Sequence, residues 1–164
     1  MPPKFIVFDL DYTLWPFYVD THVTSPFRKA SHGKIVDKHG KTIRVYPEVP
    51  EMLERLKREK YVLGVASRTD DPDAARELLG ILNWNKYFTY QEIYPGCKVA
   101  HFNKFASSSG VTYKDMLFFD DEHRNIVDVS KLGVTCVYAE RGMTKAVLEE
   151  GLKKFEDRPL SSGT

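Results

Sequence analysis

The stretch from Phe5 to Trp15 constrains the fold more than any other part of this 164-residue chain. It opens with the apolar run Phe5-Ile-Val-Phe8, which is typical of a fully buried strand in a parallel sheet. Asp9 and Asp11 follow it. Residues two apart in a strand point to the same side, so we expect both carboxylates to converge beyond the strand end, where open α/β sheets bind ligands. Acids this close favour a hard divalent cation, Mg²⁺ above all, although two solvated turn residues would show the same spacing.

Composition limits the classes of protein to which the chain can belong. It has 42% hydrophobic and 29% charged residues, as in an ordinary soluble globular protein, and its length predicts one domain. A formal net charge of +1 argues against a nucleic-acid binder. No apolar run is long enough to cross a bilayer, and no signal peptide is visible. Cys97 and Cys136 lack metal-type spacing, which fits a reducing compartment. We therefore expect a cytoplasmic monomer without nucleic-acid or membrane partners.

Strand-like and helix-like segments alternate along the remaining chain. We expect strands over residues 61–66, 87–93, 116–119 and 135–138, and helices over 47–60, 71–82, 98–106, 125–132 and 144–155. Such alternation predicts an α/β fold in three layers, a Rossmann-like parallel sheet with helices on both faces. The domain is expected to span residues 1–157, and residues 158–164 are expected to form a disordered tail.

Residues 17–46 interrupt this alternation after the first strand. Residues 34–37 and 42–46 flank a turn that contains Gly40, which predicts a small β-hairpin flap. The aromatic residues Trp15, Phe17 and Tyr18 lie at the start of this excursion. They form either an aromatic wall for a ligand or the flap's own core, and the sequence leaves both alternatives open.

Polar side chains follow the other predicted strands as well. Ser67 comes directly after the second strand, Lys98 follows the third, and Asp120 and Asp121 end the fourth. Because the carboxyl ends of parallel strands share one edge of a sheet, we expect these groups to surround the same pocket as the first two carboxylates. Carboxylates suit a metal ion, while a hydroxyl and an ammonium suit phosphate oxygens. No nucleotide-binding P-loop motif is present.

Taken in order, Asp9-Leu-Asp-Tyr-Thr13, Ser67, Lys98 and Asp120-Asp121 resemble the four-part signature of the haloacid dehalogenase (HAD) superfamily of phosphohydrolases. The longer strings at residues 8–16, 66–69 and 118–125 resemble the eukaryotic magnesium-dependent phosphatases within it. The resemblance covers nearly the whole chain apart from the tail. It implies a magnesium-dependent phosphatase in which the flap at residues 17–46 replaces the usual cap domain.

The resemblance also implies a mechanism. Asp9 would attack phosphorus and form an aspartyl-phosphate, and Asp11 would act first as general acid and then as general base. Mg²⁺ would be bound by Asp9, the backbone carbonyl of Asp11 and Asp121, with Asp120 in support.

Further residues would bind the phosphoryl group or support the metal. Leu10, Ser67 and Lys98 are the implied phosphate-binding positions, and Asn125 would order a metal-bound water. Thr13 either belongs to this set or caps the turn after the strand, and Ser67 could instead be a helix-cap loop residue. Arg68 either contacts phosphate or forms a surface salt bridge.

The substrate is a phosphorylated molecule whose class depends on the flap. A small flap implies an open site suited to phosphotyrosine, to other phosphoproteins or to protein-bound sugar phosphates, and a small sugar phosphate is the alternative. A receiver-like signalling module gathers similar groups but lacks an acid two residues after its phosphorylated Asp. A silent scaffold would not need all four motifs. Neither cysteine begins a Cys-x5-Arg loop, so a thiol phosphatase is not indicated.

Overall fold

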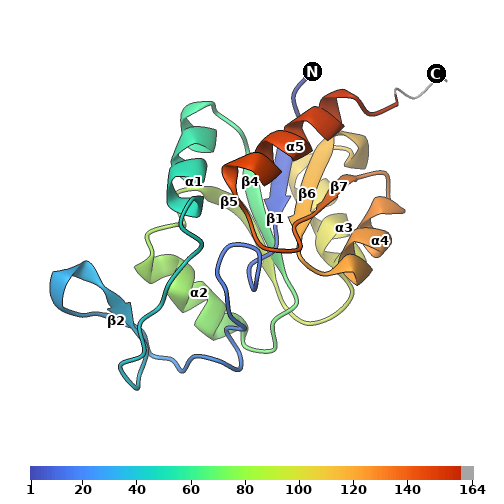
Figure 1. Cartoon of the computed structure of the whole chain (residues 1–164). Coiled ribbons are helices and arrows are strands. Elements are labelled where there is room, and N and C mark those ends of the chain that lie inside the picture. Colours follow the sequence, from blue (N-terminus) through green and yellow to red (C-terminus); the bar gives the residue numbers. More distant parts are fainter. Residues whose placement is uncertain (160–164) are drawn as a thin grey trace.

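Short apolar runs form a five-stranded parallel sheet in the computed structural model, which describes residues 1–159. The strands lie in the order β5-β4-β1-β6-β7, so the first strand is central and fully buried. Their bounds are Phe5–Phe8 (β1), Leu63–Ser67 (β4), Phe88–Ile93 (β5), Met116–Asp120 (β6) and Thr135–Tyr138 (β7). The strands run in one direction, with the N-terminus and the end of the last helix at the opposite end from their carboxyl ends (Figure 1). The predicted α/β fold class is confirmed.

Helices cover both faces of the sheet, as the sequence predicts. Alternate residues of β1 point to opposite faces, with Ile6 and Phe8 in one core cluster and Phe5 and Val7 in the other. The first cluster also contains apolar residues of three helices, α1 (Val49–Arg58), α2 (Pro72–Ile81) and α5 (Lys145–Glu156). The second contains residues of α3 (Lys98–Ser109) and α4 (His123–Ser130).

Local signals place most helix ends close to their predicted positions. Asp71 caps α2 by accepting the N–H of Ala74 at 3.1 Å, and Pro72 occupies the first turn. Helix α3 runs to Ser109, three residues beyond the expected end, because the left-handed turn that stops it lies at Gly110. Helix α4 begins at His123, two residues before the expected start.

The predicted hairpin between residues 34–37 and 42–46 forms in part. Val36 and Thr42 make an antiparallel bridge, in which the Asp37 N–H donates to the Lys41 carbonyl and the Ile43 N–H to the Ile35 carbonyl. The Asp37 carboxylate holds the turn by accepting the backbone N–H groups of Thr24, His39 and Lys41. The structure also pairs β3 (Ile35–Val36) with β2 (Arg28–Lys29), a strand that the sequence did not predict.

The hairpin also does not cover the carboxyl edge of the sheet. It projects beside α2 (Figure 1), and the chain leading to it is tied to that helix. Glu77 of α2 accepts the Ser25 hydroxyl at 2.7 Å and the Phe27 N–H at 2.6 Å. Among the described residues 17–46, only Tyr18 and Asp20 line the pocket at the carboxyl edge. The hairpin is therefore an outlying excursion, and the site remains open.

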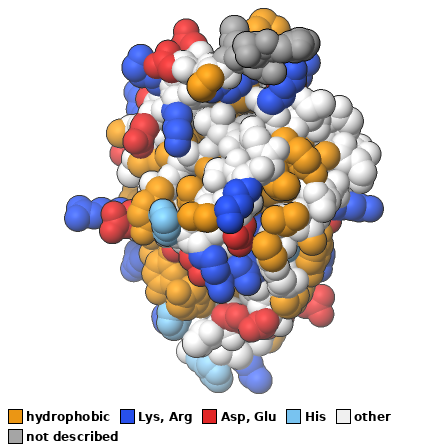
Figure 2. All heavy atoms as spheres, turned by 90° about the vertical axis from the view of Figure 1, so that its right-hand side faces the viewer, with side chains coloured by type: hydrophobic (Ala, Val, Ile, Leu, Met, Phe, Trp, Pro, Cys, Tyr) orange, Lys and Arg blue, Asp and Glu red, His pale blue; other side chains and the backbone are white. Residues whose placement is uncertain are grey.

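The first residue of the predicted tail, Arg158, packs against the last helix. Its guanidinium lies 3.7 Å from the centre of the Phe155 ring, and it forms an ion pair with Asp115. Residues 160–164 of the predicted tail lie outside the described part of the chain. Figure 2 shows the side that carries α4 and β7, where hydrophobic side chains lie between charged ones.

Within residues 1–159, no helix has the length and apolar character needed to cross a membrane.

Candidate active site

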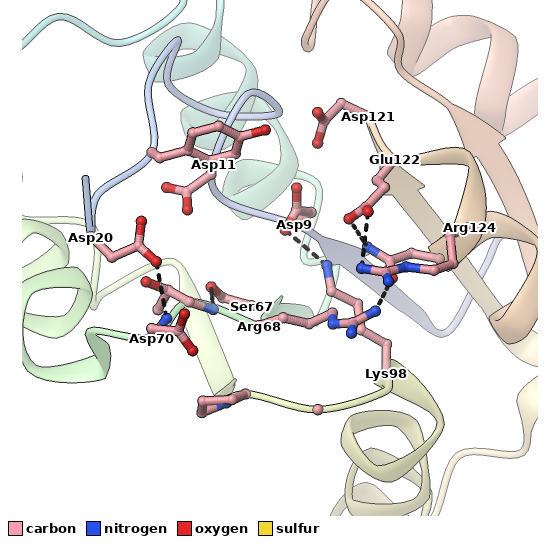
Figure 3. Close-up of a pocket in the computed structure, with 15 residues that line it drawn as sticks. Asp9, Asp11, Asp20, Ser67, Arg68, Asp70, Lys98, Asp121, Glu122 and Arg124 are labelled. Carbon is pink, nitrogen blue, oxygen red and sulfur yellow. Dashed lines mark hydrogen bonds and ion pairs between the residues drawn. The ribbon is translucent and has the colours of Figure 1, made fainter. Parts of the chain in front are cut away.

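The carboxyl ends of β1, β4 and β6 surround a pocket of about 460 Å³. From β1 the chain crosses to β4 on one side and later returns to β6 on the other, so this is the topological switch point where α/β sheets bind ligands. Figure 3 shows the lining residues converging from these strand ends and from the starts of α3 and α4. The pocket is lined by Asp9, Asp11, Tyr18, Asp20, Ser67, Arg68, Thr69, Asp70, Pro95, Gly96, Lys98, Asp121, Glu122, Arg124 and Asn125.

Asp9 and Asp11 both line this pocket, but not through the pleat of a strand. Strand β1 ends at Phe8, and the next residues form a turn in which the Leu10 carbonyl accepts the N–H groups of Thr13 and Leu14. The turn therefore brings the two carboxylates to the pocket, and the strand-alternation argument for their convergence is wrong. The Leu10 side chain is fully buried in the core, so the predicted phosphate contact at this position is left to its backbone.

Lys98 joins the first and fourth motifs. Its Nζ donates to Asp9 Oδ1 at 2.8 Å and to Asp120 Oδ2 at 2.7 Å, and its side chain is almost completely buried. Burial alone would lower the pKa of Lys98, but the two carboxylates raise it, so the ammonium is retained. A buried cation held in this way presents a fixed positive charge beside Asp9.

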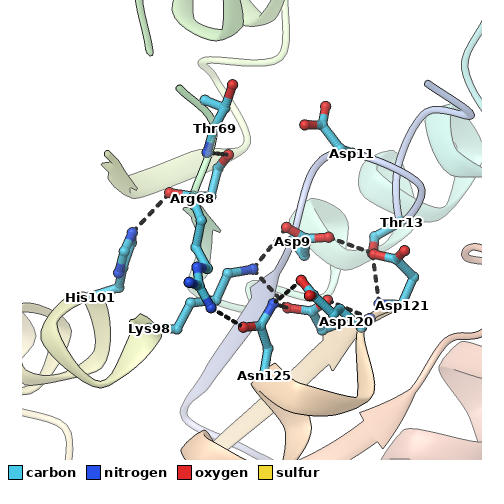
Figure 4. Close-up of polar contacts among 12 residues, drawn as sticks. Asp9, Asp11, Thr13, Arg68, Thr69, Lys98, His101, Asp120, Asp121 and Asn125 are labelled. Carbon is cyan, nitrogen blue, oxygen red and sulfur yellow. Dashed lines mark hydrogen bonds and ion pairs between the residues drawn. The ribbon is translucent and has the colours of Figure 1, made fainter. Parts of the chain in front are cut away.

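A chain of hydrogen bonds extends from Asp120 to the rim of the pocket (Figure 4). Asn125 Nδ2 donates to Asp120 Oδ2 at 3.0 Å and to Glu122 at 3.2 Å. Arg68 Nη1 donates to Asn125 Oδ1 at 3.0 Å. Arg68 therefore lines the pocket as a partner of Asn125, and within residues 1–159 it forms no surface salt bridge.

Three carboxylates lie close enough together to hold a metal ion. Asp9, Asp120 and Asp121 each offer an oxygen, and these atoms lie within 4.8 Å of one another. Burial raises the pKa of Asp9 to about 6 and also raises the pKa of Asp120 and Asp121, with repulsion among the acids adding to the shift. A divalent cation would relieve both effects, and oxygen ligands are those that Mg²⁺ prefers. The residues therefore fit the metal.

The two motif-four acids differ in how their oxygens are engaged. Asp120 Oδ2 accepts from Lys98 and Asn125, and Oδ1 accepts the Glu122 N–H at 2.9 Å, so both of its oxygens have protein partners. Asp121 Oδ1 accepts the Thr13 hydroxyl at 3.2 Å and the residue lines the pocket. This arrangement favours Asp121 as the direct ligand and Asp120 as its support.

Asp11 lies apart from this cluster and has a different environment. Its Oδ1 accepts Trp15 Nε1–H at 2.8 Å and the Val19 N–H at 3.0 Å. Burial raises the pKa of Asp11 to about 7, with the nearby charge of Asp9 adding to the effect. A carboxyl that is partly protonated near neutral pH and faces the pocket has the properties of a general acid.

Thr13 and Ser67 take distinct roles. Thr13 is fully buried, and its hydroxyl contacts Asp9 Oδ2 at 2.9 Å and Asp121 Oδ1 at 3.2 Å, so it positions two acids and does not line the pocket. Ser67 does line the pocket, and its Oγ accepts the Thr69 N–H at 3.2 Å. The cap of α2 is Asp71, which removes the helix-cap interpretation of Ser67.

The aromatic segment divides between core and pocket. Trp15 and Phe17 are buried and stack on each other with ring centres 5.5 Å apart, so they belong to the core and not to a wall of the pocket. Tyr18 is 50% exposed and lines the pocket.

Five functional candidates were missed or set aside by the sequence argument. Asp20 and Asp70 lie on one side of the pocket, opposite Arg124 and Glu122 (Figure 3). Glu122 and Arg124 directly follow the fourth motif, so their position in sequence was a usable signal. His101 is fully buried beneath Ser67, and a lone histidine inside a helix gives no such signal.

The sequence of this chain is similar to that of known phosphatases. A model of the family described as acid phosphatase matches residues 1–158. The chain belongs to this acid phosphatase family. It is 51% identical over 153 residues to human magnesium-dependent phosphatase 1, and the aligned region covers 93% of this chain and 87% of that protein. It is also 42% identical over 144 residues to an HAD-like hydrolase superfamily protein of Schizosaccharomyces pombe, which covers 81% and 83% of the two chains.

The solved structures show the same fold. An HAD-superfamily hydrolase from Ehrlichia chaffeensis matches with a TM-score of 0.67 at 11% identity, covering 94% of this chain and 97% of that chain. Together with the 42% identical HAD-like hydrolase superfamily relative, this confirms the resemblance to the HAD superfamily. This member of the acid phosphatase family is a magnesium-dependent phosphatase of the HAD superfamily, and magnesium is its cofactor.

Proposed function

We propose that this phosphatase hydrolyses phosphate monoesters through an aspartyl-phosphate on Asp9. The Asp9 carboxylate is held between Lys98 at Oδ1 and Thr13 at Oδ2, which orients it as a nucleophile. Ser67 and Lys98 would hold the phosphoryl oxygens, and Asp11 would protonate the leaving oxygen and then take a proton from the attacking water. Bound Mg²⁺ supplies the positive charge that lets an anionic carboxylate approach an anionic phosphate.

We further propose that the substrate phosphate is carried by a protein, as phosphotyrosine or as a protein-bound sugar phosphate. The observation that carries this proposal is the open rim, where Tyr18 is exposed and the hairpin of β2 and β3 contributes no lining residue among those described. An open pocket buries little of a small substrate, whereas a protein substrate adds contacts outside it.

The local packing of Tyr18 supports an aromatic contact at this rim. Its ring meets Tyr12 edge-on, with centres 4.8 Å apart, and stacks on His22 at 5.3 Å. The Tyr18 N–H donates to His22 Nδ1 at 2.9 Å, which anchors the neighbouring ring. A half-exposed tyrosine supported in this way offers a preorganised surface for an aryl group.

A small sugar phosphate is the second candidate, and the polarity of the rim favours it. Asp20 and Asp70 on one side and Arg124 on the other present groups that bind hydroxyls as well as charges. The two candidates differ in what Tyr18 does, because an aryl phosphate needs its ring whereas a sugar hydroxyl does not.

The test compares an aryl and an alkyl phosphate in the wild type and in Tyr18→Ala. We expect KM for the aryl phosphate to rise several-fold while KM for the alkyl phosphate and the kcat of both change little, since one aromatic contact is worth about 0.5–1.5 kcal/mol. Tyr138→Ala is the matched control, because Tyr138 is also exposed but does not line the pocket. Equal changes in KM for both substrates would contradict the proposed aromatic contact. A faster reaction with sugar phosphates than with phosphotyrosyl proteins would favour the second candidate.

A further inference from the structure

A buried histidine lies directly beneath the phosphate-binding side of the pocket. His101 is on α3, one turn after Lys98, and is fully buried. Its Nε2 lies 2.8 Å from the carbonyl oxygen of Ser67 (Figure 4). The same atom lies 2.9 Å from the carbonyl oxygen of Tyr94. Carbonyl oxygens only accept hydrogen bonds, so Nε2 carries a proton and donates to both.

These contacts join the ends of two paired strands to the helix that packs on them. Ser67 ends β4, Tyr94 follows β5, and His101 belongs to the first turns of α3. The Ser67 carbonyl also accepts the Tyr94 N–H at 3.1 Å, so two donors hold it in place. The imidazole ring stacks on the Tyr94 ring with centres 4.2 Å apart, which limits its rotation.

We propose that His101 is a positioning residue for phosphoryl transfer. Its Nε2–H holds the backbone of Ser67 against the start of α3, and this contact sets the distance between the Ser67 hydroxyl and the Lys98 ammonium. Both groups line the pocket, and Lys98 contacts Asp9 at 2.8 Å. Loosening the contact would therefore move two phosphate-binding groups relative to the nucleophile.

The contacts distinguish this role from simple core filling. An apolar side chain of similar size would pack at the same position without the cost of burying an imidazole, which must give up its hydration. Nδ1 has no hydrogen-bond partner among the described residues, so all the side-chain hydrogen bonds of His101 there go to the ends of β4 and β5. The inference rests on the phosphatase activity and is independent of which phosphate ester is the substrate.

The test compares three variants with the wild type at saturating Mg²⁺. His101→Leu removes the donor, and His101→Gln keeps an N–H group at a similar reach. Phe105→Leu is the matched control, because Phe105 is also a fully buried ring on α3, one turn farther from the pocket. The measurements are kcat and KM for an aryl phosphate, the inhibition constant of inorganic phosphate, the Mg²⁺ activation constant, and the thermal unfolding midpoint.

We expect His101→Leu to lower kcat by about 10- to 100-fold, the range for groups misplaced by about 1 Å, and to weaken inhibition by phosphate. His101→Gln should recover most of the loss, and the Mg²⁺ activation constant establishes that Mg²⁺ is saturating for every variant. Phe105→Leu should lower the unfolding midpoint yet keep kcat close to the wild-type value. If His101→Leu does not fold, His101→Met offers a longer apolar side chain for the same comparison.

Three results would overturn the proposal. One is a folded His101→Leu or His101→Met enzyme with wild-type kcat and phosphate inhibition. Another is a loss of kcat in Phe105→Leu as large as in the His101 variants, because activity would then follow stability and not this contact. The third is a His101→Gln enzyme no better than His101→Leu, which would show that the donated hydrogen bond has no role.

Discussion

Asp11 is the residue whose environment most clearly matches a chemical task. It is held by Trp15 Nε1–H and by the Val19 N–H, and burial raises its pKa to about 7. A group with this pKa gives and takes a proton readily near neutral pH. Both hydrogen bonds go to Oδ1, so Oδ2 is left for that exchange, away from the Asp9, Asp120 and Asp121 cluster.

We predict that Asp11→Asn slows turnover by about 10²–10⁴-fold, the usual contribution of general acid–base catalysis. The amide keeps the size of the side chain but neither donates a proton to the leaving oxygen nor removes one from water. Steady-state kinetics with an aryl phosphate measure the loss, and Mg²⁺ binding by calorimetry serves as the control for an intact site. A variant with near-native turnover would show that another group carries the proton.

His101 makes a second prediction at the residue scale, for stability as a function of pH. Burial lowers its pKa below the ordinary value of 6.5, so the unfolded chain binds a proton more readily than the folded chain. This contribution to stability is present above pH 6.5 and is lost as the pH falls from there towards the folded pKa. Its slope is at most about 1.4 kcal/mol per pH unit.

The measurement is the free energy of unfolding of the wild type minus that of His101→Gln, at several pH values. The glutamine does not titrate, and every other ionisable group is present in both proteins, so their contributions largely cancel. We expect the difference to increase from about pH 5 to 7 and to level off above that range. A flat difference would mean that the pKa of His101 is the same in the folded and unfolded chain, and a decrease with rising pH would mean that the fold favours the protonated imidazole.

At the scale of elements, the packing of α5 on the sheet depends on a glycine. Gly151 is buried in the middle of this helix, and a Cβ atom there would overlap the Phe119 ring of β6 and press on Val137 of β7. Alanine normally stabilises a helix interior relative to glycine. Here the close approach of helix and strand reverses that preference.

We therefore predict that Gly151→Ala destabilises the protein by about 1–3 kcal/mol, the usual cost of overpacking a core. Gly80→Ala in α2 is the matched control, since the nearest atom to its new Cβ is 3.8 Å away. It should be stabilising by about 0.4–1 kcal/mol. Chemical denaturation measures both changes, and effects of the same sign at the two sites would contradict this account of the α5 contact.

Element-scale prediction succeeded where the hydrophobic pattern was strong. The five strands of the sheet and the helices between them follow from apolar runs and from caps such as Asp71. The pairing of β2 with β3 was missed because these strands have two residues each, and long-range contacts decide such short strands. The Asp37 loop and the Glu77 bonds to Ser25 and Phe27 supply those contacts, and neither is visible as a periodic pattern.

At the scale of the whole molecule, the site follows from topology more than from any single residue. Asp9, Ser67, Lys98, Asp120 and Asp121 are up to 112 positions apart in the chain (121 − 9 = 112), and the parallel sheet brings them to one edge. The sequence predicted this gathering because all of them follow strands. It did not predict the pocket rim, where Asp20 and Asp70 are placed by loops, or the contact of His101 with Ser67, which depends on how α3 packs.

The central claim is that Asp9 forms a covalent bond to phosphorus during turnover. The most direct measurement reacts Asp11→Asn with an aryl phosphate and Mg²⁺, quenches the mixture, reduces any acyl phosphate with borohydride and locates the reduced residue by peptide mass spectrometry. We predict reduction at Asp9, and none in excess chelator or in Asp9→Asn, which should fold but lack activity. Phosphate release without reduction at Asp9, full activity of Asp9→Asn, or reduction at another carboxylate would contradict the claim.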